Sequence, residues 1–250
     1  QYNVEMAKEV HDAFDNNRIV PYFQPIIDTK TNQIVQYECL ARMVTASGEI
    51  LKPDVFLNVV TRSRMDGLLT RTIFSQCISR FRKTNICWSL NITAQDMLDP
   101  SLNEFITNEL KRYPHPSNIT LELIETQAIA NYSEVKAFIS MVKSKGVKVI
   151  IDDFGSGYSN ISNVLKLEVD GIKLDGGLIK QIIHDNDIYL FIEHIAAFAN
   201  QLDLLLIAES VENAAIVNAL EKANVTLMQG NHFAQPAPQF ATPENADLVC

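Results

Sequence analysis

Short apolar runs alternate with stretches of helical spacing along most of the 250-residue chain. Runs rich in β-branched residues, or with apolar and polar positions in alternation, predict strands, whereas apolar residues three or four positions apart predict helices. We expect strands at Val20–Ile27, Ile34–Arg42, Cys87–Ile92, Ile119–Ile124, Lys148–Asp152, Gly171–Leu174, Leu204–Ala208 and Thr226–Met228. We expect helices at Pro53–Val60, Leu68–Arg82, Ser101–Lys111, Ser133–Lys145, Ile188–Asn200 and Ala214–Ala223.

The order of these elements indicates the fold class. Only Asp28 to Gln33 separate the first two strands, with Asn32 as a turn residue, so these strands should form an antiparallel hairpin. The remaining strands alternate with helices, and no linker or low-complexity segment interrupts them. The sequence therefore predicts an α/β fold, a modified TIM-type (β/α)8 barrel with one antiparallel strand near the start. We assign residues 1–18 to a lead-in helix and residues 19–250 to a single domain.

Polar residues interrupt or end the predicted strands in a consistent way. Active sites of such barrels collect at the carboxyl ends of the strands, and a charge set among apolar residues is costly unless it is paired or bound to a metal. A single acid of this kind is usually exposed or salt-bridged, but a set placed at strand ends predicts a site. The set comprises Glu38, Asn91, Glu122, Asp152, Asp153, Lys173, Glu209 and Gln229.

Five carboxylates in one barrel mouth would repel one another strongly unless cations were bound. Carboxylate and amide oxygens favour hard ions, and no histidine or cysteine has ligand spacing, so we expect two Mg²⁺ or Mn²⁺ ions and not zinc. Two such ions suit the displacement of an oxygen at phosphorus. Lys173 either takes part in the chemistry or only offsets the negative charge.

Composition narrows the choice of partner and compartment. The 21 basic and 30 acidic residues give a net charge of −9, which argues against a protein that binds DNA. Four cysteines without paired spacing favour reduced thiols and a cytoplasmic location. No apolar run reaches the ~18 residues that span a bilayer. The chain begins without methionine inside a helical pattern, so we expect it to be a piece of a longer protein.

Two short motifs have competing interpretations. Asp153-Phe154-Gly155 is the triplet that holds Mg²⁺ in kinases, but the glycine-rich loop, the strand lysine and the catalytic-loop motif of a kinase are missing before it. Gly155-Ser156-Gly157 lacks the spacing of a phosphate-binding loop. Neither motif changes the prediction of a metal site.

The ordered motifs between Val20 and Pro238 resemble those of EAL domains, the bacterial phosphodiesterases of cyclic di-GMP. The resemblance rests on Tyr37-Glu38-Cys39-Leu40-Ala41-Arg42, Glu122-Leu123-Ile124-Glu125, Asp152-Asp153-Phe154-Gly155-Ser156-Gly157-Tyr158-Ser159, Asp170-Gly171-Ile172-Lys173-Leu174-Asp175 and Ala208-Glu209-Ser210-Val211-Glu212. Gln24-Pro25-Ile26, Ser89-Leu90-Asn91 and Gln229-Gly230 extend it. It implies metal-dependent hydrolysis of cyclic di-GMP to linear pGpG in bacterial second-messenger signalling.

The resemblance also implies a role for each matching residue. Glu38, Asn91, Glu122 and Asp152 resemble the ligands of a first metal, and Asp152, Asp153 and Glu209 those of a second. Lys173 is similar to the lysine that contacts the attacking water, and Glu125 to the glutamate that holds the loop from Phe154 to Asn160. The substrate groove would be lined by Gln24, Leu40, Arg42, Gln229 and Glu212. A homodimer, an attached sensory or cyclase domain and attachment to a membrane-anchored protein are implied as well.

The chain departs from the family pattern at three places. Cys39 replaces the alanine of the signature, Ser210 replaces a glycine, and Asn231-His232 follow Gln229-Gly230 where an aromatic residue is common. We expect Cys39 to be tolerated, whereas Ser210 is unfavourable if its turn needs a positive φ. The alternative functions are a cyclic di-GMP receptor or dimerisation module without turnover, and a phosphodiesterase of another nucleotide.

Overall fold

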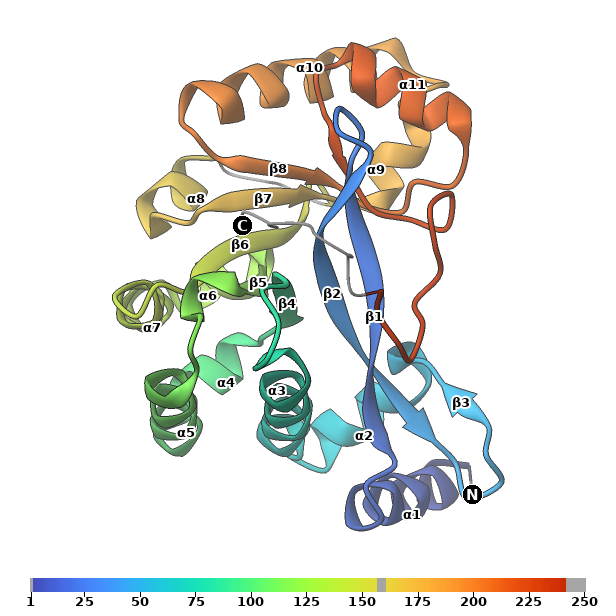
Figure 1. The fold of residues 1–250 in the computed structure, drawn as a ribbon, viewed down its shortest axis with the longest axis vertical. Coiled ribbons are helices and arrows are strands. Elements are labelled where there is room, and N and C mark those ends of the chain that lie inside the picture. Colours follow the sequence, from blue (N-terminus) through green and yellow to red (C-terminus); the bar gives the residue numbers. More distant parts are fainter. Residues whose placement is uncertain (1, 157–160, 242–250) are drawn as a thin grey trace.

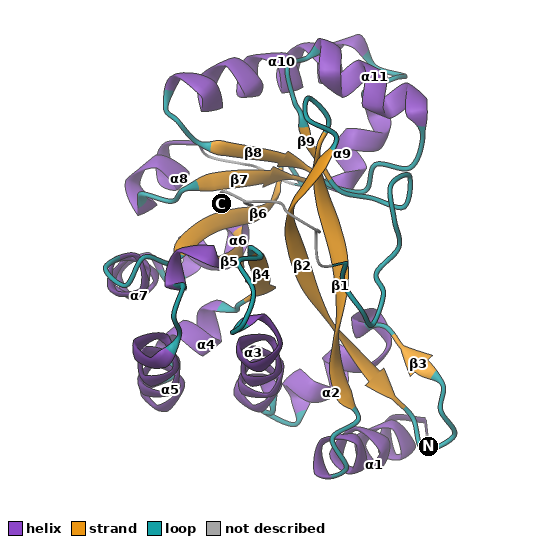
Figure 2. Ribbon diagram, in the orientation of Figure 1, coloured by secondary structure: helices purple, strands orange, loops and turns teal. Residues whose placement is uncertain are grey.

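The computed structural model describes residues 2–156 and 161–241. Within them, one sheet closes into a barrel with helices around its outside (Figures 1 and 2). The strands are β1 (Ile19–Asp28), β2 (Gln33–Val44), β3 (Ile50–Leu51), β4 (Trp88–Asn91), β5 (Ile119–Ile124), β6 (Lys148–Phe154), β7 (Gly171–Leu174), β8 (Leu205–Ala208) and β9 (Leu227–Met228). The helices are α1 (Tyr2–Asp15), α2 (Pro53–Arg62), α3 (Asp66–Phe81), α4 (Ala94–Leu98), α5 (Pro100–Arg112), α6 (Glu125–Ala130), α7 (Tyr132–Lys143), α8 (Ile161–Leu167), α9 (Gly176–Gln181), α10 (Asn186–Gln201) and α11 (Ala214–Lys222).

Strand β1 closes the barrel. Strands β2 and β4 to β9 follow one another in parallel pairings, and β1 lies between β2 and β9, antiparallel to both. The β1–β2 register runs from Ile19 opposite Met43 to Asp28 opposite Gln33. The short strand β3 pairs only with the end of β2 and stands outside the barrel. The predicted modified (β/α)8 barrel, including its one antiparallel strand, is confirmed.

All of the strands and helices expected from the sequence are present, but the prediction missed several short elements. Strand β3 has two residues, and the helices α4, α6, α8 and α9 have five to seven. An α-helix of that length makes two turns or fewer, so its sequence hardly shows a 3.6-residue period. These four helices follow barrel strands, and therefore shape the loops around the candidate site.

The lead-in helix is present as α1 and packs on the domain. Its Val10 and Ala13 are fully buried in the same apolar core cluster as the barrel strands. The cluster includes Phe81 of α3, whose ring stacks on that of Trp88 in β4 with centroids 5.5 Å apart. The placement of a domain boundary at residue 19 stays a prediction.

The cysteine prediction is only partly correct. Cys39 and Cys77 are buried free thiols, as expected. Cys87 is disulfide-bonded, which contradicts the expectation of a reduced thiol there, because sequence spacing does not report which cysteines approach in the folded chain. Cys250 lies outside the described residues. In the part of the chain that the structure describes, no helix is both long and apolar enough to cross a membrane.

Candidate active site

Glu38 is at the centre of a buried hydrogen-bond network inside the barrel. Its carboxylate accepts hydrogen bonds from Asn91 Nδ2 at 2.7 Å, Lys173 Nζ at 2.8 Å and Gln229 Nε2 at 2.6 Å. The donors come from the end of β4, from β7 and from the residue after β9, so barrel closure brings them to β2. Burial tends to raise the pKa of Glu38, but Lys173 and the hydrogen bonds lower it below its ordinary value.

The positive charge of Lys173 offsets the negative charge of three of the predicted acids. Its Nζ lies 2.7 Å from Glu122 Oε2, 2.8 Å from Glu38 Oε2 and 3.8 Å from Asp152 Oδ1. The lysine side chain is buried, which alone would lower its pKa, yet the surrounding carboxylates raise the pKa well above the ordinary value. Lys173 is therefore a permanent cation in the barrel, because a charged ammonium is the form these acids stabilise.

Glu122 retains an unused oxygen in this network. Its side chain is fully buried, and Oε1 has no hydrogen-bond partner although Oε2 pairs with Lys173. Burial and the charge of Glu38 raise the pKa of Glu122 to about 8, against the opposing effect of Lys173. A buried carboxylate oxygen without a partner is costly, and a cation would remove that cost. Glu122 thus fits a role as a metal ligand.

Asp152, Asp153 and Glu209 form a second acidic group. Carboxylate oxygens of the three residues all lie within 4.8 Å of one another, and among the described residues no other group of histidines, cysteines or acids meets this criterion. The β6–β7 register shifts between Ile151 and Phe154, and Asp153 has a φ of +56°. Successive residues of a regular strand face opposite sides, so this irregularity is what brings both aspartates to one site.

The electrostatics of this second group favour a bound cation. Burial raises the pKa of Asp152 and of Asp153 above the usual range, and it raises the pKa of Glu209 to about 7. Lys173 opposes these shifts but is 3.8 Å from Asp152 and forms no ion pair with Asp153 or Glu209. Oxygen ligands and uncompensated charge fit a hard divalent ion. The structure thus divides the predicted acids into Glu38 and Glu122, which Lys173 contacts closely, and a second group that Lys173 reaches only through Asp152.

A groove of about 490 Å³ runs beside the acids. All five residues predicted to bind substrate line it, together with two of the predicted metal ligands: Gln24, Leu40, Arg42, Gln229, Glu212, Glu38 and Glu209. Glu38, Leu40 and Arg42 alternate along β2 and therefore share one face of that strand. The groove and the acids form one continuous site.

Arg42 is held at the wall of this groove. Its guanidinium lies over the Tyr22 ring, 5.5 Å from the centroid, and Nη1 donates to the carbonyl of Ala41 at 2.8 Å. Glu212, by contrast, pairs with Lys180 at 2.7 Å on the exposed rim. The sequence prediction missed Tyr22 and Lys52, which also line the groove. Tyr22 shares a face of β1 with Gln24, so strand alternation was a signal that could have found it.

Glu125 and its predicted loop are only partly described. Glu125 is buried at the first turn of α6, directly after β5. The loop that it is predicted to hold includes residues 157–160, which lie outside the described residues. Its role stays a prediction.

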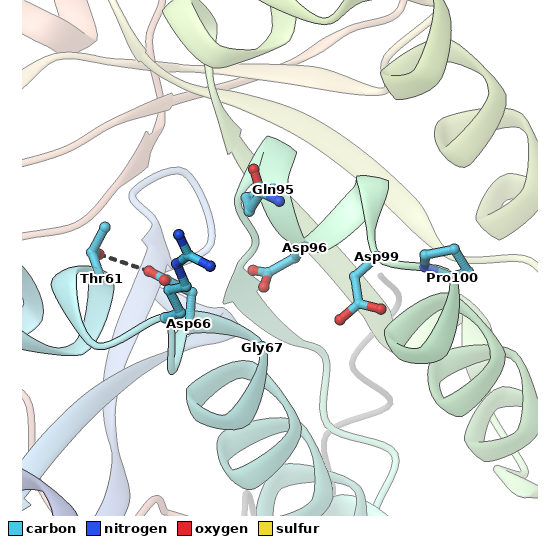
Figure 3. Close-up of a pocket in the computed structure, with 8 residues that line it drawn as sticks. Thr61, Asp66, Gly67, Gln95, Asp96, Asp99 and Pro100 are labelled. Atoms are coloured by element: carbon cyan, nitrogen blue, oxygen red, sulfur yellow. Dashed lines mark hydrogen bonds between the residues drawn. The ribbon is translucent and has the colours of Figure 1, made fainter.

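A second hollow, larger than the groove, lies between the start of α3 and the α4–α5 junction, and none of the strand-end acids lines it (Figure 3). It has a volume of about 640 Å³ and is lined by Thr61, Arg64, Asp66, Gly67, Gln95, Asp96, Asp99 and Pro100. Thr61 Oγ1 donates to Asp66 Oδ1 at 2.7 Å, the bond drawn in Figure 3. None of the predicted site residues lines this hollow, so its greater size does not make it the candidate site.

This chain is thus a TIM-type barrel protein whose strand-end acids are suited to hold divalent cations beside a groove. Comparison with known protein families identifies the family within this class. The EAL domain model matches residues 7–236, and the chain belongs to this family.

Individual relatives agree with this assignment. The chain is 27% identical over 242 residues to the signaling protein YkoW of Bacillus subtilis, covering 94% of this chain and 30% of that protein. It is 27% identical over 232 residues to the cyclic di-GMP phosphodiesterase PdeA of Borreliella burgdorferi, and the match covers 90% of this chain and 35% of that protein. The chain thus spans about a third of the length of these relatives. The PaMucR phosphodiesterase in its c-di-GMP complex shares the fold, with a TM-score of 0.87 at 23% identity over 94% of this chain and 98% of the other.

Proposed function

We propose that this chain hydrolyses cyclic di-GMP to linear pGpG in a metal-dependent reaction. The observation that carries the proposal is that Glu38 and Glu209, one from each acidic group, also line the groove that holds every predicted substrate residue. A phosphodiester in that groove would therefore meet the acids and their cations. Membership of the EAL family and the activity for which relatives such as the cyclic di-GMP phosphodiesterase PdeA are named support the choice of substrate.

Two Mg²⁺ or Mn²⁺ ions are the proposed cofactors. Asp152, Asp153 and Glu209 would hold one ion, and Glu38, Asn91, Glu122 and Asp152 the other. The short distances within the first set and the unpartnered Oε1 of Glu122 in the second support these assignments. When bound, the ions supply positive charge at the phosphate and activate water for in-line displacement.

The chain's own residues would position the reactants. Arg42 presents a guanidinium to a phosphate of the substrate, a pairing that can be bidentate. Lys173 keeps its charge inside the barrel, where it would orient the attacking water and limit repulsion among the acids. Gln24 and Gln229 are joined by a hydrogen bond of 3.0 Å and would contact the substrate as one unit. Glu125 would hold the loop after β6.

The direct test is to incubate the purified chain with cyclic di-GMP and either Mg²⁺ or Mn²⁺ and to follow pGpG by chromatography. We expect product with at least one metal and none after chelation. No product with either ion would contradict the proposal. Calorimetry that shows binding without turnover would then support the receptor alternative, and competition among cyclic dinucleotides would test base specificity.

The wider assembly is proposed on the resemblance alone. We propose a homodimer, a sensory or cyclase domain attached in the full-length protein, and a cytoplasmic location for this domain, on a soluble or a membrane-anchored protein. Light scattering of the purified chain would test the dimer. A monomer at all concentrations would contradict it for this part of the protein.

A further inference from the structure

Glu209 is anchored by the backbone at the start of helix α9. Its Oε1 accepts a hydrogen bond of 2.9 Å from the backbone N–H of Gly176, the first residue of α9. The first N–H groups of a helix have no partner within that helix. Asp175 caps the next two, accepting from the N–H groups of Gly177 at 2.8 Å and Leu178 at 3.2 Å. The N–H of Gly176 is therefore the donor left for the carboxylate of Glu209.

Ser210 occupies the space beside this donor. A Cβ atom added to Gly176 would lie 2.4 Å from Ser210 Oγ and 2.6 Å from Ser210 Cβ, closer than non-bonded atoms approach. The same Cβ would lie 3.3 Å from Glu209 Oε1, a tight contact that a small shift relieves. The obstacle to a side chain at position 176 is thus Ser210 and not Glu209.

The backbone prevents Ser210 from moving aside. Ser210 has a φ of +54°, a conformation that L-residues seldom adopt, and it directly follows Glu209. Val211 N donates to the carbonyl of Gln229 at 3.0 Å, and Glu209 N donates to that of Leu174 at 3.4 Å. Both neighbours of Ser210 are therefore bonded to strand ends, which fixes the turn.

We infer that Gly176 and Ser210 form one steric unit that positions the carboxylate of Glu209 for cation binding. Both are positioning residues, since they act on the cation only through Glu209. The inference rests on the proposed function for its kinetic consequence, but it concerns contacts that exist without substrate. It also explains how this chain accommodates a serine beside a site carboxylate: the residue facing it has no side chain.

The test is a double-mutant cycle of Gly176→Ala and Ser210→Gly, read out by Mn²⁺ calorimetry and by kinetics. Because Ser210 is held in place, the methyl of Gly176→Ala should push the start of α9 away from it and move the Gly176 N–H away from Glu209. Losing this contact should weaken Mn²⁺ binding and raise the half-saturating Mn²⁺ concentration by at least about tenfold. The KM for cyclic di-GMP should change less than kcat. Adding Ser210→Gly to Gly176→Ala removes the clashing atoms and should recover most of the Mn²⁺ affinity.

Gly67→Ala is the matched control, because a Cβ there meets only Asp99 Oδ2 at an ordinary 3.5 Å. We expect wild-type Mn²⁺ affinity for it. Unchanged Mn²⁺ binding in Gly176→Ala, or a double variant no better than Gly176→Ala, would overturn the inference. A variant that merely unfolds would lose binding stoichiometry and thermal stability without a shift in half-saturating Mn²⁺. If the wild type binds Mn²⁺ but forms no pGpG, the proposed function fails while the cycle in Mn²⁺ affinity still decides the inference.

Discussion

Lys173 Nζ lies 2.7 Å from Glu122 Oε2, and both side chains are buried inside the barrel. An ion pair in this environment is costly to form, and removing one partner leaves the other charge uncompensated. The lysine also contacts Glu38 and lies 3.8 Å from Asp152, so a single cation faces three acids. When no divalent ion is bound, Lys173 therefore supplies the positive charge that offsets the buried carboxylates inside the barrel.

Lys173→Met should destabilise the metal-free protein by about 3–5 kcal/mol, because Glu38 and Glu122 lose their counter-ion. One of these two carboxylates should take up a proton in the variant, which limits the loss of stability to that range. Urea unfolding in chelator measures it, and added Mn²⁺ should restore part of the stability. Lys222→Met on the exposed face of α11 is the control. Equal losses in the two variants would contradict a special role for Lys173.

Glu38→Ala should reduce pGpG formation by at least about 100-fold, since it removes a proposed metal ligand and the acceptor of three hydrogen bonds. Chromatographic assay at saturating Mn²⁺ measures the effect, with circular dichroism to verify folding. Glu221→Ala, an exposed glutamate in α11, should keep normal turnover. Normal turnover in Glu38→Ala would refute the assignment of this residue as a ligand.

Arg42→Ala should raise KM for cyclic di-GMP by about 10- to 100-fold with a smaller change in kcat, because a charge-assisted contact to phosphate contributes about 1.5–3 kcal/mol. Steady-state kinetics separate the two constants. Arg42→Lys keeps the positive charge but loses the planar guanidinium, so its KM should lie between those of the wild type and Arg42→Ala. A fall in kcat alone would place Arg42 in the chemical step instead of in binding.

Glu209 predicts a pH dependence of the metal-free protein. Its pKa of about 7 in the fold exceeds the ordinary 4.5, so the folded state holds an extra proton between these values. The contribution of Glu209 to stability should therefore fall as pH rises through that window, by at most roughly 3 kcal/mol, and level off above pH 7. Glu122, whose pKa is raised to about 8, extends the fall in stability to higher pH. Urea unfolding in chelator from pH 5 to 8 measures the slope. Glu209→Gln should reduce the slope between pH 5 and 7, and an unchanged slope there would show that other groups cause it.

Much of the fold could be predicted because strand and helix periodicity are local properties. The run Lys148–Asp152 and the hairpin around Asn32 identified their elements directly. The short helices α4, α6, α8 and α9 were missed because six or so residues carry little periodic signal. Cys87 was misjudged because disulfide pairing depends on approach in space.

The candidate site was predicted as a set but not as an arrangement. The acids, Asn91 and Lys173 could be identified because polar residues among apolar strand positions are conspicuous in the sequence. Their division into two groups could not, because it depends on which carboxylates the ammonium of Lys173 reaches and on the bulge that turns Asp153 toward Asp152. The sequence predicts that Ser210 is unfavourable if its turn needs a positive φ, and the φ of +54° confirms that the turn has this conformation.

The (β/α)8 barrel and the acids at its strand ends could be predicted from the order of residues, since side-chain type and spacing are properties of the sequence. The partners of Lys173 depend on the folded barrel: its ammonium lies close to Glu38 and Glu122 and reaches Asp152 only at 3.8 Å. Asp153 and Glu209 form no ion pair with it. Only the tertiary structure decided these contacts, and it also decided that Gly176 faces Ser210 across two strand ends. The physical reason is that electrostatic and steric contacts depend on distances of a few ångströms, which closure of the barrel sets between residues far apart in the chain.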